Sequence, residues 1–201
     1  MRSVAGLATP LARAAVIVAL AAAPAFAQVT IFTAALNGAN ERPTPTGSTA
    51  TGFATVTLDE ALNTLLVNET FSGLIGGGAT GAHIHCCASA AATGPVAVDF
   101  GGPNGFPLFS TSGFYSHLFD LMNAASYGAA FLTAQGSVLN ARNTVVAGML
   151  AGNTYANIHN AQFPAGEIRG QLIATPEPAT LGLLALGLLG IAGIRGRRRH
   201  M

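Results

Sequence analysis

Residues 155–172, YANIHNAQFPAGEIRGQL, decide the fold class, because they carry the alternation of two β-strands joined by a short turn. Side chains on a strand point to opposite faces in turn. Asn157 and His159 therefore share one face of the first strand, and Ala156 and Ile158 share the other. The strand thus has one polar face and one apolar face.

The second half of this stretch repeats the pattern after a turn at 163–166. Glu167 and Arg169 share a face, with apolar residues behind them. The short turn favours antiparallel pairing of the two strands, so that their polar faces coincide. We expect a polar cluster of Asn157, Glu167 and Arg169 there, with Glu167 or Arg169 in contact with His159.

Outward from this hairpin, much of the chain has the same strand-like composition. Short runs of β-branched and aromatic residues end in turn clusters such as Asn37-Gly38 and Gly76-Gly77-Gly78. These runs cover residues 29–36, 51–58, 62–71 and 95–100. Their spacing predicts an all-β domain, either an antiparallel β-sandwich or a Greek-key barrel.

Two segments depart from the strand pattern. Residues 116–130 and 138–151 carry Leu, Met and Ala at helical spacing, so we expect one or two short helical crossovers there. His117 lies in the first segment, and the sequence identifies no partner for it.

Three histidines are candidates for a shared site. In His83-Ile84-His85, the strand period of two places both imidazoles on one face. If this strand lies near the hairpin, His159 joins them, and three imidazoles suit Zn²⁺ or Cu²⁺. We favour a structural hydrogen-bonded cluster without metal over such a metal site, and a ligand-binding or catalytic role is a further alternative. In the first two cases we expect the three rings to lie near one another.

Cys86 and Cys87 are the two cysteines of the chain. Adjacent cysteines seldom bridge each other, because the ring that they close distorts the intervening peptide. In an oxidising compartment the pair forms a vicinal disulfide, forms an intermolecular bridge, or supplies thiolate ligands beside His83 and His85. We favour a vicinal disulfide or a free pair. A catalytic cysteine is not expected, because His85 is the sole nearby group that would lower its pKa.

The N-terminal residues carry a targeting pattern. Arg2 and Arg13 precede an apolar stretch at 14–23, and Ala25-Phe26-Ala27 matches a small-x-small cleavage site. We therefore expect a secretory signal peptide over residues 1–27. The mature domain, residues 28–175, is then long enough for one hydrophobic core.

The C-terminal residues carry a second targeting pattern. Pro176, Glu177 and Pro178 precede an apolar run at 179–194 and then four arginines. As a helix this run reaches roughly 24 Å, short of a ~30 Å hydrocarbon core. The arginines would stay in the cytoplasm, which leaves the preceding residues outside it.

This tripartite tail, residues 176–201, resembles the PEP-CTERM sorting signal of exopolysaccharide-producing Gram-negative bacteria. The resemblance implies that the hydrophobic helix anchors a precursor in the inner membrane. It also implies that an exosortase-type membrane protease removes the tail. The protein would then pass to the cell surface or the extracellular matrix.

Three segments together resemble the CHRD domain, a module of chordin and of many exported bacterial proteins. They are GANERP at 38–43 with TATG at 49–52, AHIH at 82–85, and the hairpin at 155–172. The resemblance implies an all-β, immunoglobulin-like or superoxide-dismutase-like barrel of no established enzymatic activity. The chain departs from the family pattern at Cys86-Cys87 and in the Ala/Gly-rich stretch 101–136.

Composition and missing motifs narrow the function. Residues 28–175 contain three arginines, no lysine and seven acids, a formal charge of −4, so nucleic acid is not an expected partner. The sequence holds no nucleophile elbow, phosphate loop, dinucleotide fingerprint or zincin motif.

We therefore predict a non-enzymatic surface protein without a cofactor, which is structural, adhesive or associated with exopolysaccharide or other surface proteins. The alternative is a dismutase-like barrel that binds zinc or copper through His83, His85 and His159.

Overall fold

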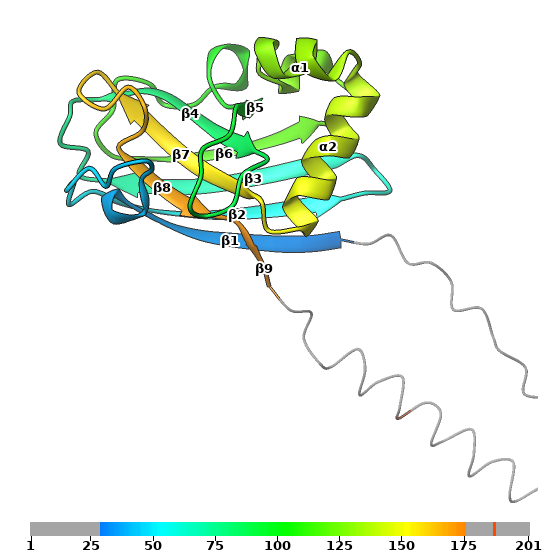
Figure 1. Cartoon of the computed structure of the whole chain (residues 1–201), viewed down its shortest axis with the longest axis horizontal. Helices are drawn as coiled ribbons and strands as arrows, with labels where there is room; N and C mark the ends of the chain where they lie inside the picture. The colour runs from blue at the N-terminus through cyan, green and yellow to red at the C-terminus, as the bar shows by residue number, and fades with distance from the viewer. Residues whose placement is uncertain (1–28, 176–186, 188–201) are drawn as a thin grey trace, which may run out of the picture.

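The computed structural model describes residues 29–175 and residue 187 (Figure 1). The predicted signal peptide lies outside the described residues. So do Pro176, Glu177 and Pro178 and nearly all of the predicted hydrophobic helix. Within the described part, no helix is long and apolar enough to cross a bilayer.

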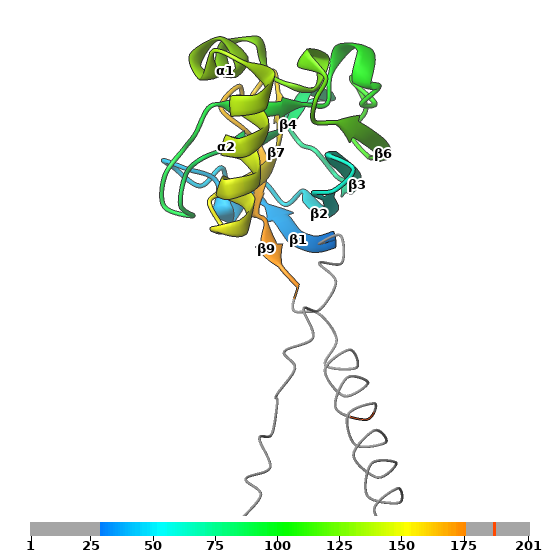
Figure 2. The same cartoon turned by 90° about the vertical axis from the view of Figure 1, so that its right-hand side faces the viewer.

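The described strands form one antiparallel sheet that curls into a half-barrel (Figures 1 and 2). Along the chain they are β1 Val29–Asn37, β2 Thr51–Asp59, β3 Thr64–Ser72, β4 Ala79–Cys86, β5 Val96–Asp99, β6 Gly113–Asp120, β7 Thr154–Asn160, β8 Ile168–Gln171 and β9 Ile173–Ala174. Their order across the sheet is β5-β4-β7-β8-β1-β2-β3-β6, and β9 pairs with β1. The predicted all-β class is confirmed at this level.

The core lies on the concave side of the sheet, and strand alternation fills it. Val56 and Leu58 on β2 and Leu65 and Val67 on β3 are fully buried, while the residues between them face outward. The turn between these strands uses Asn63 with φ of 55°, a left-handed conformation that asparagine tolerates better than most residues. An aromatic group closes the far side of the core, formed by Phe100, Phe106, Tyr115 and Phe119.

Two helices cover the open side of the half-barrel. Helix α1 spans Ala129–Gln135 and packs on β5, and α2 spans Val138–Leu150 and packs on β4, β7 and β9 (Figure 2). Ser137 caps α2, because its side chain accepts a hydrogen bond from the backbone N–H of Asn140.

The helical prediction is right for 138–151 and largely wrong for 116–130. Residues 113–120 form strand β6, which pairs with β3 along its length, and α1 begins at Ala129. Tyr115 and Phe119 point into the core with a period of two, and their burial outweighs the helical spacing of the leucines. His117 therefore lies on a strand, with its ring beside those of Tyr115 and Phe119.

The loops 38–50 and 161–167 lie together at one end of the half-barrel (Figure 1). They are joined there, since the hydroxyl of Thr46 donates to the carbonyl oxygen of Glu167. β1 begins at the other end, where the N–H of Thr175 donates to the carbonyl oxygen of Ile31. The nine residues of β1 separate these two ends by roughly 26 Å.

Candidate functional site

The predicted hairpin and the HxH strand form neighbouring strands of the sheet. β4 pairs with β7 so that His83 lies opposite Asn157 and His85 lies opposite Tyr155, while His159 pairs with Gly81. All three histidines lie on the face away from the core. Their ring centroids are 5.0 to 5.6 Å apart. The prediction that the rings lie together is confirmed, and their role stays a prediction.

Each imidazole has one nitrogen in a defined contact. Nδ1 of His85 lies 2.9 Å from the carbonyl oxygen of Gly94, and Nδ1 of His159 lies 3.1 Å from that of Pro164. Nε2 of His83 lies 3.5 Å from Oδ1 of Asp99, the residue opposite it on β5. The polar atoms that anchor the rings therefore come from three separate segments.

The rings of His85 and His159 face each other through the nitrogens that these contacts leave free. Nε2 of His85 and Nε2 of His159 are 3.3 Å apart, and one nitrogen from each ring lies within 4.8 Å of the others. Nδ1 of His83 is buried without a hydrogen-bond partner among the described residues. Burial lowers the pKa of His83 to about 4 and that of His85 to about 3, and it also lowers the pKa of His159. The rings are therefore neutral at pH 7, the form that binds metal.

A second row of polar side chains lies beside the histidines. The ring of His85 stacks on Tyr155 at 4.7 Å, and the guanidinium carbon of Arg169 lies 3.5 Å from the centroid of the same tyrosine. Asn157 donates to the carboxylate of Glu41. Burial raises the pKa of Glu41 to about 7, although the bond from Asn157 and the charge of Arg169 oppose the shift.

No hydrogen bond or ion pair joins His159 to Glu167 or Arg169 among the described residues, so the predicted contact is not a polar one. Glu167 precedes β8, and its buried carboxylate accepts bonds from the hydroxyl of Ser48, the N–H groups of Ile75 and Gly76, and the amide of Asn160. It ties three loops together at the far end of the hairpin. Arg169 donates to the carbonyl oxygen of Ser89.

Thiolate ligation beside the histidines is also wrong. Cys86 follows His85, so alternation turns its side chain to the core face of β4, where it is fully buried. Its sulfur is bridged to that of Cys87, and both lie against the carbonyl oxygen of Thr144 on α2. The structure thus has the vicinal disulfide that the sequence left as one of several alternatives.

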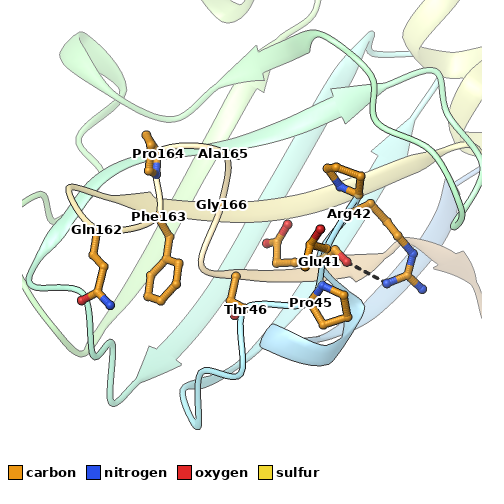
Figure 3. A pocket seen from close by; sticks show the side chains of 11 residues that line it. Glu41, Arg42, Pro45, Thr46, Gln162, Phe163, Pro164, Ala165 and Gly166 are labelled. Atoms are coloured by element: carbon orange, nitrogen blue, oxygen red, sulfur yellow. Dashed lines mark hydrogen bonds between the residues drawn. The ribbon is translucent and has the colours of Figure 1, made fainter.

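A cleft of about 350 Å³ opens between two loops at the turn of the hairpin (Figure 3). Its walls are the loop 41–46 and the loop 162–166, with Phe163 and Gln162 at one end and Arg42 at the other. Pro164 belongs both to this wall and to the contact with His159. The cleft therefore borders the cluster without containing it.

Sequence reasoning missed Asp99, Gly94, Tyr155 and Glu41 as members of this face. Asp99 is the last but one residue of the predicted strand 95–100, and a carboxylate at that position was the available signal. Its partner depends on the pairing of β4 with β5, which contains an irregularity between Ile84 and His85. Regular alternation along a strand does not predict an irregular register of this kind.

The fold and this face define an all-β domain with two helices and a cluster of imidazoles outside its core. A family model for the CHRD domain matches residues 32–172, and the chain belongs to that family. A PEP-CTERM protein-sorting motif matches residues 174–199. A search of curated proteins and a search of solved structures found no match.

The sorting motif indicates where the cell sends the protein. It marks an exported, membrane-anchored precursor that exosortase, a membrane protease, processes for the cell surface. The sequence-based recognition of both segments is confirmed.

Proposed function

We propose that the protein is a non-enzymatic component of the surface of a Gram-negative bacterium and that it associates with exopolysaccharide. The proposed location at the cell surface rests on the sorting motif. The adhesive role is supported by one observation on the fold, a face of three uncharged rows on the outer side of strands β1, β2, β3 and β6, bordered by a row that carries Asp59 and Asp120.

Cross-strand pairing arranges this face in three rows. The middle row is polar and consists of Thr33, Thr55, Asn68 and Ser116. The flanking rows are Ala35, Phe53, Thr70 and Phe114 on one side and Ile31, Thr57, Leu66 and Leu118 on the other. None of the twelve side chains carries a charge.

Three of the large apolar side chains on this face are well exposed. Phe53, Phe114 and Leu118 are 49%, 63% and 59% exposed. Sugars present C–H faces that stack on aromatic rings and hydroxyl edges that bond to threonine, serine and asparagine. A polysaccharide therefore matches the alternation of apolar and hydroxyl rows better than a charged partner does.

Co-sedimentation with exopolysaccharide from the native host tests this role. We expect the double variant Phe53→Ser/Phe114→Ser to bind at least about tenfold more weakly than the parent. Phe109→Ser is the matched control, because Phe109 is 82% exposed but lies in a loop outside this face. Equal binding by both variants would contradict the proposal, and loss of self-association alone would assign the face to contacts between copies of the chain.

A second function, metal binding, is favoured by the convergence of His83, His85 and His159. Three neutral imidazoles suit zinc or copper. The immunoglobulin-like or superoxide-dismutase-like barrel that the family resemblance implies is part of this second proposal. It does not require enzymatic activity, because a bound ion can serve stability or adhesion.

A further inference from the structure

The contacts of the three histidines determine where each ring carries its proton. A carbonyl oxygen accepts hydrogen bonds and cannot donate them, so a neutral ring beside it places N–H toward it. Gly94 and Pro164 therefore hold the protons of His85 and His159 on Nδ1. Nε2 of His83 lies 3.5 Å from the carboxylate of Asp99, whose negative charge favours a proton on this nitrogen although the two atoms form no hydrogen bond.

The other nitrogen of each ring then carries a lone pair. Nε2 of His85 and Nε2 of His159 face each other across 3.3 Å, and neither has a proton to share. Nδ1 of His83 is a buried acceptor without a donor among the described residues. A buried polar atom without a partner costs about 1–3 kcal/mol, and facing lone pairs add repulsion. The three lone pairs therefore lack a proton donor or a positive ion between them.

A metal ion satisfies these three lone pairs more completely than a water molecule does. One water has two protons and can satisfy two of the three acceptors. A transition-metal ion accepts all three lone pairs and leaves the hydrogen bonds to Gly94 and Pro164 and the contact with Asp99 intact. Ligating histidines in proteins commonly have such outer partners, which fix the ring orientation.

We propose that Nδ1 of His83 and Nε2 of His85 and His159 bind one copper or zinc ion, copper more tightly, and that Asp99 is a positioning residue for His83. This inference rests on the second proposed function, metal binding, and deepens it. At metal–nitrogen distances of about 2.0–2.1 Å, ligating nitrogens lie about 3.3–3.6 Å apart. His85 and His159 already have that spacing, and because the three residues each offer a nitrogen within 4.8 Å of the others, His83 needs to approach by at most about 1.5 Å.

The ligand set supports copper as the tighter ion. It contains imidazole nitrogen and neither carboxylate nor thiolate, and copper(II) exceeds zinc in affinity for such sites. His83 and His159 are half-buried, so the ion keeps an open side for water or another small ligand.

Metal titration of the full-length chain in detergent tests the ligands. After chelator treatment, the protein is equilibrated with copper(II) or zinc(II) alone. We expect one ion per chain and tighter binding of copper. Ala substitutions at His83, His85 and His159 should each weaken copper binding at least about 100-fold, because each removes a ligand. His117→Ala is the matched control, since His117 lies on β6 outside the cluster.

The copper(II) spectrum separates ligation from folding. Electron paramagnetic resonance should show coupling to three imidazole nitrogens in the parent and in His117→Ala. Far-UV circular dichroism of the metal-free variants reports whether each one folds. Retention of all three couplings in a folded His83→Ala variant would overturn the ligand assignment.

Asp99 has its own test. Asp99→Asn should bind copper about 10- to 100-fold more weakly and change the copper hyperfine splitting, and Asp99→Glu should restore most of the affinity. An unchanged spectrum and affinity in Asp99→Asn would overturn the positioning role. Absence of binding by either ion would refute metal binding altogether, whereas tighter binding of zinc would overturn the copper preference and leave metal binding intact.

Discussion

Glu69 lies in the core with a carboxyl group that the fold does not satisfy. It is 1% exposed, on β3 between Ala54 and Tyr115, and neither carboxyl oxygen has a hydrogen-bond partner among the described residues. Burial raises the pKa of Glu69 from 4.5 to about 8. The folded protein therefore holds this residue in its neutral form at pH 7.

The raised pKa makes stability depend on pH with a definite sign. The unfolded chain releases the proton near pH 4.5 and the folded chain near pH 8. The stabilisation is therefore complete below pH 4.5 and is lost as the pH rises to 8. One pKa unit corresponds to 1.36 kcal/mol, so the loss is about 3 kcal/mol at pH 7 and about 4 kcal/mol at pH 8.

Glu69→Gln removes this pH dependence, because glutamine has nearly the same shape and does not titrate. We expect the variant to match the parent within about 1 kcal/mol at pH 4 and to be up to about 4 kcal/mol more stable at pH 8. Urea unfolding of both proteins at pH 4, 6 and 8 measures the difference, in which the other titrating groups cancel.

Glu60→Gln serves as the control for Glu69→Gln. Glu60 forms a partly exposed ion pair with Arg142 at 3.6 Å, and such pairs contribute about 0–1 kcal/mol. A stability difference between Glu69→Gln and the parent that stays constant from pH 4 to 8 would refute the reasoning. It would mean that Glu69 has a partner in the folded state that the geometry does not include.

Two further substitutions test the packing around the site. Gly148→Ala should destabilise the protein by about 1–3 kcal/mol in urea unfolding, because a Cβ there would lie 2.6 Å from the sulfurs of both Cys86 and Cys87; a Cys86→Ala/Cys87→Ala background should remove most of this cost, and an unchanged cost would contradict the explanation. Glu167→Gln should cost about 2–4 kcal/mol, because the amide N–H₂ replaces one carboxylate oxygen and would face the N–H group of either Ile75 or Gly76. Faster hydrogen exchange at these two amides would locate the effect, and exchange equal to that of the parent would contradict it.

The local part of the site could be predicted from the sequence because it depends on a period of two. His83 and His85 share a face on any strand, and so do Asn157 and His159. The pairing of β4 with β7 could not be predicted in the same way. These strands are separated along the chain by β5, β6 and both helices, so their contact depends on the whole fold.

The segment 116–130 shows the opposite case, in which a local pattern pointed to the wrong structure. Leu118, Leu121 and Met122 have helical spacing, yet Leu118 is exposed on β6 while Tyr115 and Phe119 are buried. The deciding interaction is the ladder with β3, whose residues lie about fifty positions earlier. Long-range pairing of this kind overrides weak local preferences.

The error over Glu167 also shows how the site is supported. Alternation along the strand assigns Glu167 to the face of His159, but β8 begins one residue later and its side chain turns to the loops. There it bonds to Asn160, whose side-chain oxygen accepts from the N–H groups of Gln162 and Phe163.

That loop continues to Pro164, whose carbonyl oxygen fixes the ring of His159. The connection from Glu167 to His159 therefore runs through the backbone of residues 160–164 rather than through a direct contact. A substitution at Glu167 should then change the orientation of His159 as well as the stability of the protein. In the copper(II) form of the Glu167→Gln variant, the couplings of His83 and His85 would persist while that of His159 weakens. Equal weakening of all three would instead indicate a general loss of the fold.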